Sequence, residues 1–267
     1  GAPFFMLMGR FASLFASDPT KVAMMVNSMS ATFSALTILF LFWTITHLAR
    51  KIVIKKQNEI TLAQYIGIMG AGLVGALAYT FSDTFWFSAV EGEVYASSSL
   101  FTAVVFWAIL KWEDAADESH SDRWLIFIAY MMGLSIGVHL LNLLVIPAIV
   151  LVYYFKKYTP SVKGILWALL VSCLILGTIM YGFIPGSIEV AGWFELFFVN
   201  VLGFSYNSGA LVYVISVIAI LSWAIYETYK GSNESRMKLS FLLAIIILGI
   251  PFIGDSIIVP VLIIGAL

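Results

Sequence analysis

Charge is what this sequence has least of. Only 11% of its 267 residues are charged, whereas 61% are hydrophobic and the mean hydropathy is +1.00. Because a soluble domain carries about 25% charged residues, this composition excludes an ordinary water-soluble globular protein and predicts that lipid is the natural solvent. The formal net charge of −1 gives no indication of a nucleic-acid partner.

Cysteine is nearly absent as well. Cys173 is the only cysteine and lies within an apolar run, so no disulfide can form within the chain and we expect this thiol to serve packing. The sequence starts with GAPFFMLMGRF, which has neither an initiator Met nor the pattern of a signal peptide, and it ends inside the apolar run VPVLIIGAL. We therefore expect an internal fragment of a longer membrane protein.

Apolar runs separated by short polar stretches predict an all-α, polytopic integral membrane protein, organised as a single membrane domain over residues 1–267. Residues 1–17 are too short to cross about 30 Å of hydrocarbon and predict a helix at the outer membrane interface, followed by a helix start at Asp18-Pro19. About eight transmembrane segments follow, with the last ones in residues 159–267. They are 22–48, 62–81, 100–112, two short passes within 124–155 that meet at His139 and Asn142, 165–184, 211–226 and a truncated pass from residue 239.

The distribution of Lys and Arg fixes an orientation for these segments. All of them except Arg10 and Lys21 fall in connections that the alternation of passes places on one side of the membrane. Such a bias marks the inner side by the positive-inside rule. Residues 81–99, His139 and the segment 186–209 are then expected on the outer side.

Acidic and aromatic residues crowd together in residues 81–99, FSDTFWFSAVEGEVYASSS, between two apolar runs. One interpretation is an exposed polar loop beside the aromatic belt of a membrane interface. The functional interpretation is that Glu91, Glu93 and Tyr95 form the wall of an active site, where a carboxylate acts as a base or holds a cation. Trp86 is the aromatic candidate for substrate binding in this stretch.

Two further candidates come from other parts of the chain. His139, at the expected outer end of a helix, either bonds a backbone carbonyl or donates to a phosphate or an acceptor hydroxyl, and Asn142 follows it within GVHLLN. Arg10 either places its charge at the interface by extending along the apolar surface or meets an anionic lipid headgroup.

A glycine-rich motif in the second predicted span does not indicate nucleotide binding. Gly70-Ala-Gly72-Leu-Val-Gly75 matches GxGxxG, but it lies inside an apolar run instead of between a strand and a helix. The spacing of Gly67, Ala71 and Gly75 by four residues predicts a face of small residues for close helix packing.

Three stretches together resemble one family of membrane proteins. They are GAPFFMLMGRF at the start, FWFSAVEGEVY around Glu93, and GLSIGVHLLNLLVIPA around His139. Their order and spacing are similar to a bacterial membrane family, within the GT-C glycosyltransferases, that includes an animal protein O-mannosyltransferase. The resemblance is best over residues 18–158 and extends to the start of the chain.

The resemblance implies a GT-C-like enzyme in the bacterial inner membrane with its site facing the periplasm. Its partners would be membrane lipid, a polyprenyl-phosphate-linked sugar as donor, and a Ser or Thr hydroxyl of an exported protein as acceptor. The family's catalytic acid is expected upstream of Gly1, in a loop that ends with His-Pro-Pro-Gly before the position matching Ala2. Within this chain, Glu93 and His139 are the catalytic candidates.

The remaining roles also follow from the resemblance. Arg10, Glu91, Tyr95, Asn142 and Trp86 are the substrate-binding candidates. The charge of the leaving phosphate would be stabilised by Arg10, His139 or a divalent metal, and no residue is assigned as a metal ligand.

Two other functions remain open from the sequence. A secondary transporter would place polar groups at mid-membrane, for which Asp255 is the one candidate. A non-catalytic membrane scaffold is the other alternative.

Overall fold

The computed structural model describes residues 2–54, 60–231 and 233–249, and it is all-helical over these residues. Two compact units are present, residues 1–172 and 173–267, and each is described by itself. The all-α fold expected from the sequence is confirmed. The expectation of a single membrane domain stays a prediction.

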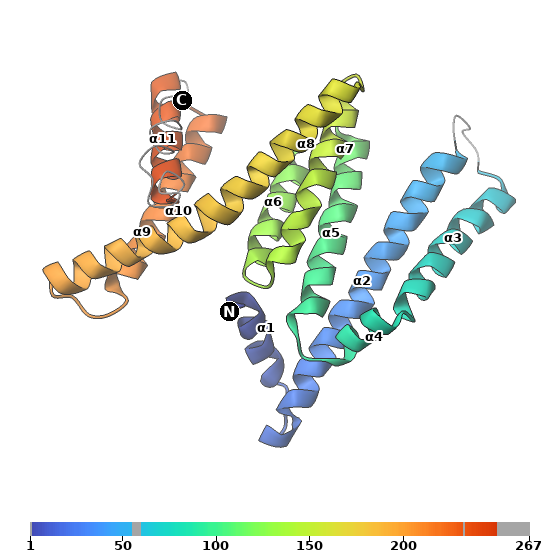
Figure 1. Cartoon of the computed structure of the whole chain (residues 1–267), viewed down its shortest axis with the longest axis horizontal. Coiled ribbons are helices and arrows are strands. Elements are labelled where there is room, and N and C mark those ends of the chain that lie inside the picture. The colour runs from blue at the N-terminus through green and yellow to red at the C-terminus, as the bar shows by residue number, and fades with distance from the viewer. Residues whose placement is uncertain (1, 55–59, 232, 250–267) are drawn as a thin grey trace. The chain divides into compact units, whose positions relative to one another are not determined.

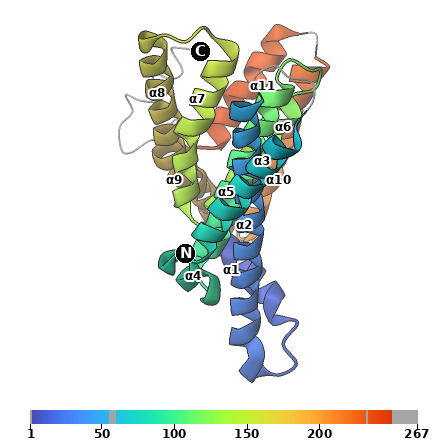
Figure 2. The same cartoon turned by 90° about the vertical axis from the view of Figure 1, so that its right-hand side faces the viewer.

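Unit 1 is a set of long helices that run alternately up and down (Figure 1). Its elements are α1 (Pro3–Ser13), α2 (Val22–Val53), α3 (Leu62–Thr80), α4 (Asp83–Val90), α5 (Val94–Ala115), α6 (Asp122–Ile136), the 3-10 segment η2 (Leu140–Val145), α7 (Ile146–Lys157) and the first part of α8 (Val162–Gly177). The expected division of residues 124–155 is confirmed as a division into two helices, because α6 ends at Ile136 and the chain turns at His139 before η2. The turned view in Figure 2 shows α1 and α4 beside α2, with one end of α2 extending beyond them.

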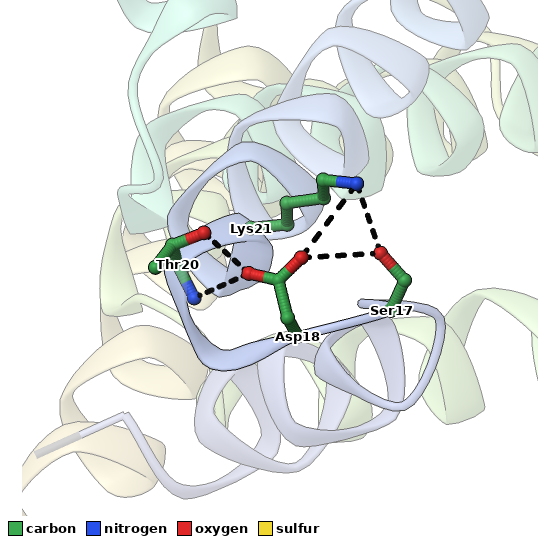
Figure 3. Close-up of polar contacts among 4 residues, drawn as sticks. All are labelled: Ser17, Asp18, Thr20 and Lys21. Carbon is green, nitrogen blue, oxygen red and sulfur yellow. Dashed lines mark hydrogen bonds and ion pairs between the residues drawn. The ribbon is translucent and has the colours of Figure 1, made fainter.

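The connection between α1 and α2 is organised by Asp18 (Figure 3). Its carboxylate accepts hydrogen bonds from the Thr20 backbone N–H at 3.0 Å, from the Thr20 hydroxyl and from the Ser17 hydroxyl, and Lys21 Nζ lies 3.6 Å away. These bonds, above all that from the Thr20 hydroxyl, hold the pKa of Asp18 below its usual value. Pro19 follows at the first position of a short 3-10 turn that leads into α2, so the predicted helix start is confirmed.

Ion pairs join the other ends of α2, α5 and α7, which we call the cationic end of unit 1. Lys51 Nζ on α2 lies 2.7 Å from Glu113 and 3.3 Å from Asp114 on α5. Lys156 Nζ on α7 lies 2.8 Å from Asp117, and this contact lowers the pKa of that carboxyl. The ends of α2, α5 and α7 that were predicted to share a side do meet, whereas the alternation of passes across a membrane stays a prediction.

Six helices within the described residues are long and apolar enough to cross a membrane. They are Pro19–Val53, Leu62–Thr80, Val94–Ala115, Leu140–Lys157, Val162–Val201 and Ser208–Tyr229. The expected number was about eight. The difference arises at α6, with 15 residues, and α11 (Glu234–Ile247), with 14, which at a rise of about 1.5 Å per residue fall short of about 30 Å of hydrocarbon.

The surface of unit 1 is apolar and its helix interfaces contain small polar residues. Leu62, Ile66 and Val74 on α3 are 74%, 60% and 69% exposed. In contrast, Ser30 and Ser34 on α2 and Ser97 on α5 are fully or almost fully buried. This distribution suits a lipid solvent, in which small residues allow close helix contact and large apolar ones face the acyl chains.

The glycines of α3 serve packing, as expected, but on a different face. Gly72 is buried, and a Cβ there would collide with side chains of Thr46 and Phe42 on α2, whereas Gly67 and Ala71 are exposed. The contact face is therefore formed by Ile68, Gly72 and Ala76, and the prediction that Gly67, Ala71 and Gly75 form it is wrong for its first two members.

Residues 81–99 are not a loop, contrary to expectation. Residues 83–90 form α4, and α5 begins at Val94, six residues before the predicted start at residue 100. Phe85 is buried and its ring lies 4.5 Å from that of Tyr79. Burial of this ring holds α4 against the end of α3, and only Glu91, Gly92 and Glu93 connect α4 to α5.

Unit 2 contains the rest of α8, a π-helical segment (Thr178–Phe183), α9 (Ile184–Leu196), a second π-helical segment (Phe197–Val201), α10 (Ser208–Tyr229) and α11. The segment 186–209, expected outside the membrane, is helical up to Val201 and continuous with α8. Glu195 accepts hydrogen bonds from the backbone N–H groups of Asn207 and Ala210, at the start of α10. Cys173 is exposed, so its predicted packing role is wrong. Asp255 lies outside the described residues.

Candidate active site

The loop between α4 and α5 is held against α2 by a close contact at Gly92. A Cβ at this position would lie 2.9 Å from Val26 Cγ1 and 3.0 Å from Asn27 Oδ1. The N–H of Glu93 donates to the carbonyl of Glu91 at 2.9 Å, and Glu93 is the N-cap residue of α5. Glycine therefore allows the two carboxylates to sit at a tight turn close to the packed helices.

A pocket of about 930 Å³, which we call the acidic pocket, opens beside this loop. It is bounded by the end of α3, by α4 and by the start of α5. Three of its residues carry carboxylates and none is a Lys or Arg. The lining residues are Tyr79, Ser82, Asp83, Thr84, Phe85, Phe87, Ser88, Glu91, Glu93, Tyr95 and Ser99. The pocket is thus a region of negative potential, which suits the acceptance of a proton or the binding of hydroxyl groups.

An apolar groove of about 820 Å³ adjoins the acidic pocket. The two share the residues Tyr79, Tyr95 and Ser99. From there the groove passes between α2, α3 and α5 to η2 and the start of α7. Its apolar lining includes Leu41, Ile45, Ala103, Phe106, Leu141, Leu144, Val145 and Ala148. Because the acidic pocket and the apolar groove meet at two tyrosines and a serine, together they can hold an amphipathic molecule.

His139 lies next to this junction. Its ring is 5.7 Å from that of Tyr95, and its Nδ1 accepts a hydrogen bond from the N–H of Leu141 at 3.1 Å. Because Nδ1 accepts, the proton of the neutral ring is on Nε2. His139 therefore caps η2 with one nitrogen and can donate with the other.

Asn142 lies inside the protein and lines neither the pocket nor the groove. Its side chain is fully buried, donates to the Ser135 hydroxyl at 2.7 Å and accepts from the Thr102 hydroxyl at 3.0 Å. These bonds join η2 to α5 and α6, and they fix the turn that carries His139. The geometry gives Asn142 a positioning contact, while its predicted contact with substrate remains a prediction.

The start of α1 reaches the same corner of the molecule. The N–H of Phe4 donates to the carbonyl of Gly137 at 2.8 Å, two residues before His139. Phe5 packs with Phe101 and Val138, and both Ala2 and Val94 lie against this cluster. The start of α1 therefore packs against the same cluster as the start of α5, next to the turn that carries His139.

Arg10 and Trp86 are not brought to the pocket. Arg10 is exposed on α1 and donates to the Ser13 hydroxyl at 3.2 Å. Trp86 is 53% exposed, stacks on Phe81 with a centroid distance of 6.1 Å, and lines a smaller hollow of about 370 Å³ on α4. The structure therefore gathers Glu91, Glu93, Tyr95 and, beside them, His139.

Sequence reasoning missed Tyr79, the lining residue that lies outside the predicted stretch 81–99, and within that stretch it did not single out Asp83 or Ser99 as site residues. Asp83 is visible in the sequence as an acid among aromatic residues, but Tyr79 lies in an apolar span where nothing in the pattern marks a pocket. Within the described parts of the chain, no three His, Cys, Asp or Glu side chains gather as a metal site would require. A need for a divalent metal stays a prediction.

Comparison with known proteins identifies the family to which the sequence of unit 1 is related. No curated protein and no solved structure matches the chain significantly. Residues 1–162 match the family described as Protein O-mannosyl-transferase TMEM260 N-terminal domain. This match contains α1, the pocket, the groove and His139. Because it covers more than half of the 267 residues, the chain belongs to this family of protein O-mannosyltransferases.

Proposed function

We propose that the chain transfers a sugar, mannose by the family's description, from a polyprenyl-phosphate carrier to a Ser or Thr hydroxyl of an exported protein. The observation that carries this proposal is the junction at Tyr79, Tyr95 and Ser99, where the acidic pocket meets the apolar groove. The groove suits the isoprenoid chain of the donor, and the pocket suits the sugar and the acceptor hydroxyl.

The reaction requires one bond to form and one to break. The acceptor oxygen attacks the anomeric carbon, the bond from that carbon to the phosphate oxygen breaks, and polyprenyl phosphate leaves with the electron pair. The hydroxyl proton must pass to a base. Glu93 and Glu91 are the candidate bases in this chain, and the acid expected upstream of Gly1 would enter at the same corner, beside Val94.

The leaving phosphate has to avoid the carboxylates, since like charges repel at short range. The side of the junction toward His139 is free of acids among the lining residues of the groove. There the Nε2–H of His139 and the hydroxyl of Tyr95 are the candidate donors to the developing negative charge. Arg10 would require a movement of α1 to take part.

A matched pair of variants in the full-length protein tests this assignment. Glu93→Gln keeps size and removes the base, so we expect the rate constant kcat to fall by about 100-fold or more. Glu118→Gln, an exposed carboxylate in the α5–α6 connection, is the control and should retain activity within about twofold. The assay is transfer from polyprenyl-phosphate mannose to a Ser/Thr peptide, followed by mass spectrometry. Near-normal kcat for Glu93→Gln at normal expression would remove Glu93 from the site.

We further propose that the pocket faces away from the cytoplasm, at the periplasmic face of a bacterial inner membrane. The support is the gathering of Lys and Arg at the cationic end, opposite α4, since such residues favour the cytoplasmic side. Cysteine labelling in intact cells tests it, in a Cys173→Ser background. A membrane-impermeant maleimide should label Ser88→Cys near the pocket but not Ser121→Cys at the cationic end; the reverse pattern would overturn the orientation.

A further inference from the structure

A separate pocket of about 390 Å³ lies at the cationic end of unit 1, between α2, α3 and α5. It shares no lining residue with the acidic pocket or the apolar groove. Its polar lining includes Arg50, His47 and Lys111, and its aromatic lining includes Trp43, Tyr65 and Trp107. Among the residues that the structure describes, no carboxylate lines it.

The described acids nearest to this pocket form ion pairs with Lys51 and not with the cations that line the pocket. Glu113 and Asp114, the carboxylates within the last turn of α5, are both engaged by Lys51 at 2.7 and 3.3 Å. Lys111 Nζ lies over the Trp107 ring at 5.6 Å. Arg50 is exposed and makes no ion pair with any residue that the structure describes. Arg50 and Lys111, neither of which forms an ion pair with a described residue, therefore face one cavity.

His47 adds an unsatisfied polar atom. Its Nδ1 lies 3.6 Å from Asp114, while its Nε2 is buried and has no hydrogen-bond partner among the described residues. A buried polar nitrogen without a partner is rare, and it commonly marks the place of a water or a bound group. The pocket thus combines the cationic donors Arg50 and Lys111 with the Nε2 atom of His47, which lacks a hydrogen-bond partner among the described residues.

The surroundings indicate that the bound group comes from the bilayer. Tyr65 and Trp43 are 54% and 39% exposed, next to the exposed apolar face of α3. Aromatic and cationic side chains occur together at the level of lipid headgroups, and phosphate accepts well from both guanidinium and ammonium groups. We propose that this pocket binds the phosphate of an anionic glycerophospholipid through Arg50 and Lys111, with the acyl chains outside on α2 and α3.

Native mass spectrometry of the purified full chain, titrated with phosphatidylglycerol or phosphatidylcholine, tests the proposal. The variant Arg50→Gln/Lys111→Gln should lose about tenfold or more in affinity for phosphatidylglycerol, with little change for phosphatidylcholine. The matched control is Arg123→Gln/Lys163→Gln, which removes two cations from the same end of unit 1 outside the pocket. It should change the affinity by less than about twofold.

Other outcomes would overturn the proposal. An equal loss in both double variants would mean diffuse surface charge, and no loss in the first would mean no site. Displacement of the lipid by millimolar inorganic phosphate would assign the pocket to a soluble anion. If the double variant does not fold, Arg50→Gln alone alters an exposed side chain and should still lower the affinity for phosphatidylglycerol about threefold or more. An unchanged affinity of this single variant would also overturn the proposal.

Discussion

Replacement of Asn142 by Ala distinguishes a positioning role from a substrate contact. The side chain is 0% exposed and makes two hydrogen bonds, to Ser135 at 2.7 Å and from Thr102 at 3.0 Å. Truncation removes both. It leaves no orphaned donor, because the Ser135 hydroxyl also donates to the Met132 carbonyl and the Thr102 hydroxyl can donate to Ser98.

The size of the effect follows from these contacts. A hydrogen bond between helices in a membrane protein contributes about 0.6 kcal/mol on average and about 1.7 kcal/mol at most. Two such bonds, together with the small cavity left by the carboxamide, predict that Asn142→Ala lowers the free energy of unfolding by about 1–3 kcal/mol. The turn that carries His139 should loosen, so transfer activity should fall along with stability.

A double-mutant cycle gives the measurement. Unfolding of Asn142→Ala, Ser135→Ala and the double variant in bicelles should show a coupling of about 0.6–1.7 kcal/mol between the two residues. Additive effects would mean that this bond contributes nothing. Wild-type stability of Asn142→Ala, combined with a raised KM for the lipid-linked donor, would refute the positioning role and favour the substrate contact predicted from the sequence.

Three further perturbations test other parts of the structure. Gly92→Ala should lower transfer with little loss of stability, since its Cβ would press on α2 and shift the carboxylate loop; kinetics and thermal unfolding of the variant check this. Gly72→Ala should weaken the packing of α3 on α2 and lower the free energy of unfolding by about 1–3 kcal/mol. Gly70 has open space around it, so Gly70→Ala should be neutral or raise the free energy of unfolding by up to about 1 kcal/mol. Equal effects of the two variants in unfolding assays would contradict the packing described for this helix. The pKa of Asp18 is lowered in the folded chain, so its contribution to the stability of the α1–α2 connection is present above the unfolded pKa of about 3.9 and is lost as the pH falls through the folded pKa. Protease cleavage between α1 and α2 should therefore rise below about pH 4. The variant Asp18→Asn should not show this rise.

Much of the fold could be predicted because the composition indicates that the solvent is lipid. With 61% hydrophobic and 11% charged residues, the chain has to place its backbone in helices within lipid. Polar residues then mark the connections, which is why the turn at His139 and the start at Asp18-Pro19 were predicted correctly. The side shared by Lys51, Lys111, Lys156 and Lys157 followed from the same alternation.

The internal arrangement of the helices was a different matter. In lipid, both the packed face and the exposed face of a helix are apolar, so hydrophobic periodicity does not indicate which face makes contact. For this reason the contact face of α3 was misplaced from Gly72 to Gly67, and Tyr79 could not be recognised as part of a pocket. The aromatic content of residues 81–99 suggested an exposed loop, but burial of Phe85 against Tyr79 folds most of it into helix.

The sequence by itself determined the lipid solvent, the helical class, the helix ends of unit 1 that meet at the cationic end, and the candidate residues Glu91, Glu93, Tyr95 and His139. These features depend on composition and on the positions of polar residues along the chain. Only the tertiary structure decided which candidates lie together. It placed the carboxylates in one pocket, set Tyr95 between that pocket and an apolar groove, buried Asn142 among helices and left Arg10 and Trp86 outside. The physical reason is that a pocket is formed by contacts between distant segments, which a one-dimensional pattern of apolar residues does not encode.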